Sequence, residues 1–257
     1  MKYNSLKQLE KIYKKPIYIY TDPIKYIYQF KENYNKELVG LIIALFSYGN
    51  VKAMFQFMDC LIDFLKPDPY EKILTFKENS NMNLYYRFQN QNDIKTILII
   101  LKQLIKNNDS SKYLFKNFFG SNFSNITHIY PIIDTFIYNI KAIIPEKFLT
   151  YGVQHYFCLR NKNSVLKRYC LFFRWMVRKD FPDFALYDFI DPAKLIYPVD
   201  IHILNFSYQK NIISSKNITR KNAIKITNYF KQFSPEDPLK YDFYITREMM
   251  LKNTFRY

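Results

Sequence analysis

The sequence predicts an all-α fold in the style of an orthogonal helical bundle. Apolar residues recur at helical spacing along most of the 257 residues, and no convincing run of alternating polar and apolar residues predicts a strand. Only four glycines occur, which argues against a fold built from many tight β-hairpins. Hydrophobic residues make up 49% of the chain, enough for the core of one large domain or of two small lobes.

The first long helical pattern runs over residues 37–66 and stops before Pro67. Apolar spacing continues on both sides of Gly49, so we expect a break or bend at this glycine. Residues 75–92 then form a polar, Asn-rich connector whose end contains the aromatic stretch LYYRF. The alternatives for Gly49 are a simple kink and a close approach to a bound base.

Three further helices are predicted between residues 93 and 143. One amphipathic helix is expected over 93–107, with Asp93 as its N-cap. A shorter one is expected over 110–120, ended by Gly120, and another around residues 132–143.

The stretch SVLKRYCLFFRWMVRK (164–179) predicts a helix with Ser164 as N-cap. Its apolar residues share one side, and three cations line up on the opposite side: Lys167, Arg174 and Arg178. Arginine grips phosphate with two donors, and its use in a chain that otherwise prefers lysine favours phosphate binding. The alternative is a solvated cationic face on a buried helix.

Lys167 has a second interpretation. A lysine beside Arg168 and near the positive end of a helix is favoured in its neutral, nucleophilic form. The alternatives are therefore a structural or phosphate-binding role and a chemical role.

The segment YPVDIHILNF (197–206) predicts the start of another helix, with Asp200 at the N-cap. Capping alone explains an aspartate at this position. His202, two residues further on, would then be a packed and hydrogen-bonded histidine. Catalysis is the alternative for Asp200.

Charge indicates the class of partner. Lys and Arg total 38 against 22 Asp and Glu, a net charge of +16, which is typical of proteins that bind a polyanion such as nucleic acid. AT-rich codon usage also enriches a chain in lysine without any functional reason. The alternative is therefore a protein whose charge reflects codon usage and whose partner is another protein.

The three cysteines show no CxxC spacing and no accompanying histidine cluster, so we expect no zinc, iron–sulfur cluster or other cofactor. No GxGxxG or GxxxxGK loop occurs. The start of the chain lacks a signal-peptide pattern, and the longest apolar runs, such as 38–46, are too short to span a bilayer. We therefore expect a cytoplasmic protein without membrane contact. The basic charge makes association with the nucleoid the expected location, and no feature of the sequence demands more than a monomer.

Several segments resemble known families. PVDIHIL resembles the catalytic-aspartate signature of the helix-hairpin-helix DNA glycosylase superfamily. Four segments resemble more closely a bacterial family that carries the domain-of-unknown-function label DUF2400, itself similar to the 8-oxoguanine branch of these glycosylases. These are residues 41–65, 167–180, 197–204 and 233–243.

The resemblance implies a two-lobed helical protein with a cleft in which a flipped base of damaged duplex DNA is held. One barrel-like lobe would span 39–199 and include the hairpin region. The other would combine 1–38 with 200–257. The interval at 180–195, where the superfamily carries its glycine-rich hairpin, contains no glycine here.

The resemblance also implies site residues. Lys167 would be the nucleophile that attacks the sugar C1′, with Lys179 and Lys194 as the alternatives, and Asp200 would stabilise the cationic sugar. Residues expected to contact DNA are Arg168, Arg174, Arg178, Lys179 and His202. Residues expected around the base pocket are Tyr48, Gly49, Asn50, Lys52, Tyr241 and Asp242.

The expected function is base excision of an oxidised purine, 8-oxoguanine, with an associated AP-lyase step. A DNA-binding protein on the same fold, without this chemistry, is the alternative.

Overall fold

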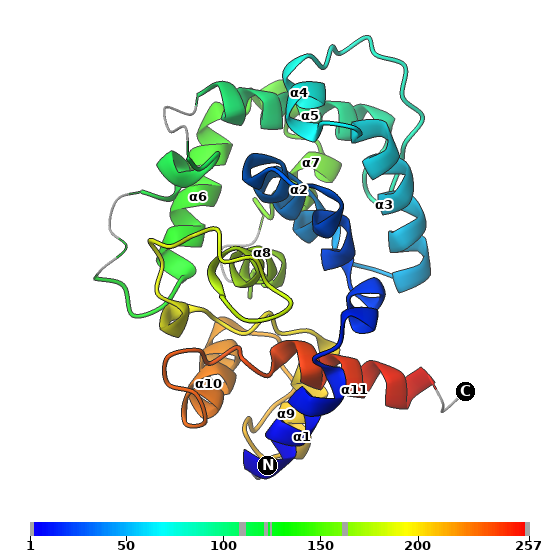
Figure 1. The fold of residues 1–257 in the computed structure, drawn as a ribbon. Helices are drawn as coiled ribbons and strands as arrows, with labels where there is room; N and C mark the ends of the chain where they lie inside the picture. The colour runs from blue at the N-terminus through cyan, green and yellow to red at the C-terminus, as the bar shows by residue number, and fades with distance from the viewer. Residues whose placement is uncertain (1–2, 108–111, 121–122, 124, 161–163, 255–257) are drawn as a thin grey trace. The chain divides into compact units, whose positions relative to one another are not determined.

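The computed structural model describes residues 3–107, 112–120, 123, 125–160 and 164–254 (Figure 1). In these ranges the chain forms helices and no strand, and Tyr86 and Gln89 make an isolated β-bridge. The prediction of an all-α fold is confirmed. No helix within the same ranges has the length and apolar character needed to cross a membrane.

The chain divides into two compact units. Unit 1 comprises Met1–Lys25, Ser124–Tyr130 and Asn163–Tyr257, and unit 2 comprises Tyr26–Phe123 and Pro131–Lys162. The predicted lobes, 39–199 and 1–38 with 200–257, differ from these units at residues 26–38, 124–130 and 163–199. Buried ion pairs of Arg174 and Arg178, described below, join residues 163–199 to the C-terminal region.

Unit 1 contains the helices of both chain ends. Their bounds are α1 Tyr3–Tyr13, η1 Pro16–Thr21, α8 Lys167–Val177, η5 Pro192–Lys194, α9 Ile201–Gln209, α10 Arg220–Lys231 and α11 Asp242–Thr254. Helix α11 packs against both α1 and α9. The buried Tyr13 of α1 donates a hydrogen bond to Glu248 of α11, 2.5 Å long, which joins the two ends of the chain.

Unit 2 is built around α2. The helices of this unit are α2 Asn33–Phe46, α3 Val51–Leu65, α4 Pro69–Leu74, α5 Gln91–Lys106, η3 Lys116–Phe119, η4 Glu146–Phe148 and α7 Tyr151–Tyr156. Two more helices cross the boundary in sequence: η2 Pro23–Gln29, and α6 Tyr130–Ile143, of which only the first residue belongs to unit 1. Residues 38–46 of α2 are all buried, as expected of a helix that is apolar on every side. Helix α4 packs on α2, α3 and α5, and α5 packs on α7.

The predicted break at Gly49 is confirmed. Helix α2 ends at Phe46, α3 begins at Val51, and Gly49 adopts a φ of +91°, which favours glycine. The Asn50 side chain caps α3 by accepting hydrogen bonds from the backbone N–H groups of Lys52 (3.0 Å) and Ala53 (3.2 Å).

The predicted cap of α5 is wrong by three residues. Asn90 is the N-cap, and Asp93 is the third helical residue, where its carboxylate accepts a hydrogen bond from the backbone N–H of Asn90. The two side chains form a capping box, so the acidic residue alone did not mark the start of the helix.

The helix predicted over 110–120 is also wrong, although 110 and 111 lie outside the described residues. Only the short 3₁₀ turn η3 forms before Gly120. The backbone N–H groups of Leu114 and Phe115 donate to the buried carboxylate of Glu37 at 2.9 and 3.0 Å, instead of to helical carbonyls. The helix predicted around 132–143 is confirmed by α6.

The presumed hairpin region does not form a helix-hairpin-helix. Between α8 and α9 the described chain has only the turn η5, and the loop folds back onto the end of α8. The N–H of Phe184 donates to the carbonyl of Trp175 (2.8 Å), and the N–H of Tyr187 donates to that of Met176 (2.7 Å).

Candidate functional site

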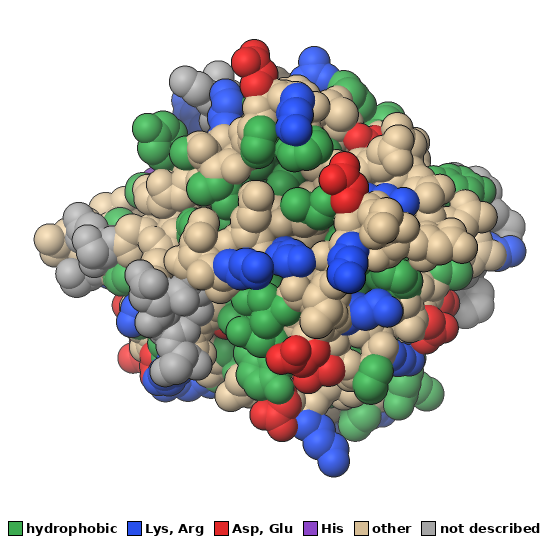
Figure 2. Space-filling view, turned by 90° about the horizontal axis from the view of Figure 1, so that it is seen from above, with side chains coloured by type: hydrophobic (Ala, Val, Ile, Leu, Met, Phe, Trp, Pro, Cys, Tyr) green, Lys and Arg blue, Asp and Glu red, His purple; other side chains and the backbone are tan. Residues whose placement is uncertain are grey.

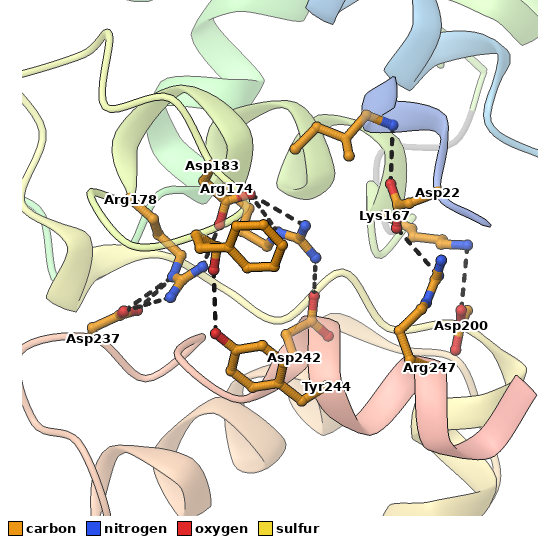
Figure 3. Close-up of polar contacts among 12 residues, drawn as sticks. Asp22, Lys167, Arg174, Arg178, Asp183, Asp200, Asp237, Asp242, Tyr244 and Arg247 are labelled. Carbon is orange, nitrogen blue, oxygen red and sulfur yellow. Dashed lines mark hydrogen bonds and ion pairs between the residues drawn. The ribbon is translucent and has the colours of Figure 1, made fainter. Parts of the chain in front are cut away.

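Lys167 and Asp200, 33 positions apart in the sequence, meet in unit 1 (Figure 3). The distance from Lys167 Nζ to Asp200 Oδ2 is 3.6 Å. Their side chains are 34% and 19% exposed, so the pair is partly shielded but open to solvent. This geometry allows both electrostatic attraction and proton transfer after a small movement.

Lys167 is the first residue of α8, which places its backbone at the positive end of that helix. The predicted cap Ser164 is wrong, because Leu166 is the N-cap residue and no side chain caps the helix. Leu166 adopts a left-handed conformation with a φ of 49°, which is costly for a side chain larger than glycine. Ser164 Oγ instead accepts a hydrogen bond from the N–H of Leu166 at 3.3 Å, which holds the turn before Lys167.

Asp200 uses its two carboxylate oxygens differently. Oδ1 accepts hydrogen bonds from the backbone N–H groups of His202 and Ile203, both 2.9 Å long, and so caps α9 as predicted. Oδ2 faces Lys167. Capping therefore fixes the orientation of the carboxylate and leaves one oxygen for the amine.

Two of the cations expected to contact DNA are buried inside unit 1. The side chains of Arg174 and Arg178 are 3% and 1% exposed and pair with internal carboxylates. Together they form an arginine–aspartate cluster, defined here as Arg174, Arg178, Asp183, Asp237 and Asp242 (Figure 3). Contrary to the prediction of phosphate contact, these guanidinium groups bind carboxylates of the protein itself.

Asp183 is the centre of the cluster. Its carboxylate accepts hydrogen bonds from Arg174, at 3.2 and 3.3 Å, and from Arg178. Arg174 also donates to Asp242 at 2.6 Å, while Arg178 donates to both oxygens of Asp237 at 2.9 and 3.0 Å. The cluster thereby ties α8 to the loop after it and to the start of α11.

Burial and charge act in opposite directions on this cluster. Burial alone would lower the pKa of Arg174 and Arg178, but the neighbouring carboxylates, Asp183 first, raise the pKa of both above its ordinary value. Burial raises the pKa of Asp242 to about 6; Arg174 opposes this rise, and the negative charges of Asp200 and Asp183 add to it. The ionisation of Asp242 is therefore coupled to the charge of Asp200.

A further ion pair supports the same region. Arg247 of α11 lies 3.2 Å from Asp22 and donates to the carbonyl of Thr21 at 2.6 Å. Sequence analysis missed Asp22, Asp183 and Arg247, because their partners are distant in sequence or follow no helical spacing. In the sequence Arg247 stands beside Glu248, and Asp183 stands three positions after Asp180, so no isolated charge marked them.

The remaining residues expected to contact DNA differ in exposure. Lys179 is exposed just after α8, whereas Arg168 and His202 are half-buried near the starts of α8 and α9. Lys194, an alternative nucleophile, is half-buried at the end of η5. All four belong to unit 1.

The residues expected around a base pocket fall into two groups. Tyr241 and Asp242 are buried in unit 1, and Asp242 is engaged with Arg174. Tyr48, Gly49, Asn50 and Lys52 belong to unit 2, where Gly49 and Asn50 shape the start of α3.

Tyr48 lies in an aromatic group of unit 2. Its ring is nearly parallel to that of Phe88, with 6.2 Å between centroids, and packs edge-on against His155 at 4.7 Å. The guanidinium of Arg87 lies over both Tyr48 and Phe88. Phe88 is 42% exposed, so part of this group faces solvent.

Within the part of the chain that the structure describes, no group of three or more His, Cys, Asp or Glu side chains is placed to hold a metal ion. The acidic residues of the arginine–aspartate cluster are occupied by guanidinium groups instead.

The fold and site together define an all-helical protein in which a lysine at one helix start faces an aspartate that caps another. The chain belongs to the family described as "Protein of unknown function (DUF2400)", whose model matches residues 22–250. This range includes Lys167, Asp200 and the whole arginine–aspartate cluster. Neither the curated proteins nor the solved structures contain a match to the chain.

Proposed function

We propose that the protein is a DNA glycosylase that removes an oxidised purine, 8-oxoguanine, from duplex DNA, with an associated AP-lyase step. The observation that carries the proposal is the 3.6 Å approach of Lys167 Nζ to Asp200 Oδ2. A nucleophilic amine beside an oriented carboxylate is the pair that this chemistry requires.

In the proposed reaction, Asp200 Oδ2 first accepts a proton from the Lys167 ammonium. The amine lone pair then attacks the sugar C1′ of a flipped nucleotide while the bond from C1′ to the base breaks. The base leaves with the bonding electrons and takes up the proton held by Asp200, which returns Asp200 to its carboxylate form. Loss of a proton from nitrogen and opening of the sugar ring give a Schiff base. The Asp200 carboxylate stabilises the positive charge that develops on the sugar. From the Schiff base, water releases the enzyme or β-elimination cleaves the strand.

The charge of the chain supports DNA as the partner. A net charge of +16 attracts phosphates over a distance, and Figure 2 shows Lys and Arg side chains spread across one face of the molecule. The half-exposed Lys167 is accessible from solvent, as an attacking group must be.

A DNA-binding protein without this chemistry is the second candidate. It is favoured by one observation: capping of α9 already gives Asp200 a structural role through Oδ1. In this alternative the ion pair only fastens the start of α8 to that of α9.

Covalent trapping with borohydride tests the proposal, because reduction converts the Schiff base into a stable amine between protein and DNA. Duplexes carrying 8-oxoguanine, an abasic site or undamaged guanine are compared. We expect an adduct on the first two and none on the third. Lys167→Gln should abolish it, and Asp200→Asn should slow its formation by about 10²–10³-fold.

The Asn substitution keeps an acceptor oxygen for the cap of α9, so loss of trapping in that variant reports on charge rather than on folding. Lys179→Gln and Lys194→Gln are the matched controls and should still be trapped. Tight binding of the duplexes without any adduct or base release would reject the enzyme in favour of the second candidate. Trapping that disappears in a control variant, and not in Lys167→Gln, would move the nucleophile to that residue.

A further inference from the structure

The longest part of the chain without an acidic residue lies directly after Asp200. Residues 201–235 contain no Asp or Glu and carry six cations: Lys210, Lys216, Arg220, Lys221, Lys225 and Lys231. The stretch comprises α9, the loop that follows it and α10, all within unit 1. Neutralising charges are therefore absent from this stretch.

Helix α10 presents two of its lysines on one face. Lys221 and Lys225 are exposed and stand four positions apart, which places them as neighbours on the helix surface. The opposite face is buried and includes Ala223, Ile226 and Phe230. The ring of Phe230 lies nearly parallel to that of Phe206 of α9, with 6.4 Å between the ring centres, so the buried face of α10 meets α9 at this point.

The loop between the two helices is held in place by side chains. The amide of Asn222, which is 7% exposed, donates to the carbonyls of Ser215 (3.2 Å) and Asn217 (2.8 Å). Thr219 Oγ1 caps α10 by accepting a hydrogen bond from the N–H of Asn222. The exposed Lys216 lies 5.1 Å from the ring centre of Tyr208, which fixes it beside the end of α9.

Four exposed lysines of the stretch 201–235 have no ion-pair partner among the described residues: Lys210, Lys216, Lys221 and Lys225. They are called the lysine surface below. Like-charge repulsion between Lys221 and Lys225 lowers stability, because neither lysine has an ion-pair partner in the part of the chain that the structure describes.

We propose that the lysine surface binds the phosphate backbone of duplex DNA and supplies the phosphate contact that Arg174 and Arg178 do not make. The inference rests on DNA as the partner in the proposed function, but not on the glycosylase chemistry. Asp200 and Lys210 stand at the two ends of α9, about 15 Å apart at 1.5 Å per residue. That distance corresponds to roughly four base pairs of duplex at 3.4 Å each, so one duplex can contact both.

The chemistry of the surface favours DNA over a membrane. A helix that binds a membrane surface inserts an apolar face, whereas the apolar face of α10 is already buried in the protein. The exposed residues between these lysines are Asn211, Ser214, Asn217, Ile218 and Thr219. Four of the five are polar and offer hydrogen bonds to phosphate oxygens, and Ile218 is the single apolar side chain among them.

A salt titration of binding tests the surface with the full-length protein and an undamaged duplex. The triple variant Lys216→Gln, Lys221→Gln, Lys225→Gln removes three charges from it. Each lost phosphate contact lowers the slope of log K against log salt by about 0.9, so we expect a decrease of about 2 to 3 and binding at least roughly tenfold weaker. Circular dichroism checks that the variant keeps its helices.

The matched control removes the same charge from unit 2, through Lys77→Gln, Lys106→Gln and Lys141→Gln, all exposed. This control variant should bind the duplex with almost the same slope of log K against log salt as the wild type. Equal weakening in both triple variants would show a bulk charge effect and overturn the proposal, as would unchanged binding in the first. Stronger loss of binding to anionic vesicles than to duplex would overturn it in favour of a membrane.

The two proposals fail separately. Duplex binding that depends on the lysine surface, without borohydride trapping, would keep the surface and reject the glycosylase. Trapping that remains normal in the first triple variant at low and high salt would keep the chemistry and reject the surface.

Discussion

Unit 1 contains two groups of cationic side chains, one buried among carboxylates and the other exposed to solvent. Arg174 and Arg178, at the end of α8, are buried and share three aspartates, whereas the residues of the lysine surface are exposed and have no ion-pair partner among the described residues. The planar guanidinium can satisfy several carboxylate oxygens at once, which makes it suitable for a buried position. The ammonium of lysine keeps its hydration and suits a surface that meets mobile or polymeric anions. Positive charge in the sequence therefore does not by itself identify a face that can bind phosphate, because the cations must also be exposed.

The largest effect is expected from breaking the buried group. Asp183→Asn removes the charge that Arg174 and Arg178 share and leaves two guanidinium groups undercompensated in a dry environment. We expect a loss of about 3–5 kcal/mol in the free energy of unfolding, measured with urea. The control is Asp180→Asn, an exposed aspartate three positions earlier, which should change stability by less than about 0.5 kcal/mol. Similar effects of both substitutions would mean that the cluster contributes little.

A second, smaller effect should appear in the pH dependence of stability. Because the pKa of Asp242 is about 6 in the folded protein and 3.8 ordinarily, the unfolded chain loses this proton first as pH rises. Its contribution to stability is therefore full below about pH 4 and falls until about pH 6, by up to roughly 3 kcal/mol at 1.36 kcal/mol per unit.

Asp242→Asn removes this titration. Relative to wild type, the variant should become progressively more stable between pH 4 and pH 7, measured by urea unfolding across that range. A constant difference between the two proteins over this range would show that Asp242 ionises normally.

The smallest change in stability is expected from a substitution in the lysine surface, and this change should be a gain. Lys221→Glu places an acid in the first turn of α10 and four positions before Lys225, both favourable arrangements. We expect a gain of about 0.5 kcal/mol in stability together with weaker duplex binding. Lys231→Glu, at the other end of the helix, is the control and should reduce stability slightly. A loss of stability in Lys221→Glu would show that this lysine has a structural role.

Much of the local structure could be predicted from sequence. The break at Gly49 and the cap at Asp200 depend on a φ value and on hydrogen bonds within three residues, so neighbouring residue types are sufficient to predict them. Errors occurred where a distant group competes. The N–H groups of Leu114 and Phe115 bond to Glu37, more than seventy positions away, and a predicted helix is lost.

In the candidate site, too, the residues could be predicted from local sequence, whereas their contacts depend on distant segments. Lys167 and Asp200 were chosen from their motifs, but their approach to 3.6 Å depends on the packing of α8 and α9 within unit 1. Helical spacing put Lys167, Arg174 and Arg178 on one face, and nothing local showed that two of them would be buried. Arg174 and Arg178 find partners 68 and 59 positions away in Asp242 and Asp237.

By itself, then, the sequence determined the helical class, the break at Gly49, the cap at Asp200 and the acid-free stretch after it. Tertiary structure decided which cations are buried with carboxylates and which remain exposed. The physical reason is the range of the interactions: caps and helical hydrogen bonds join residues within about four positions. Desolvation of a charge, in contrast, depends on every segment that packs around it.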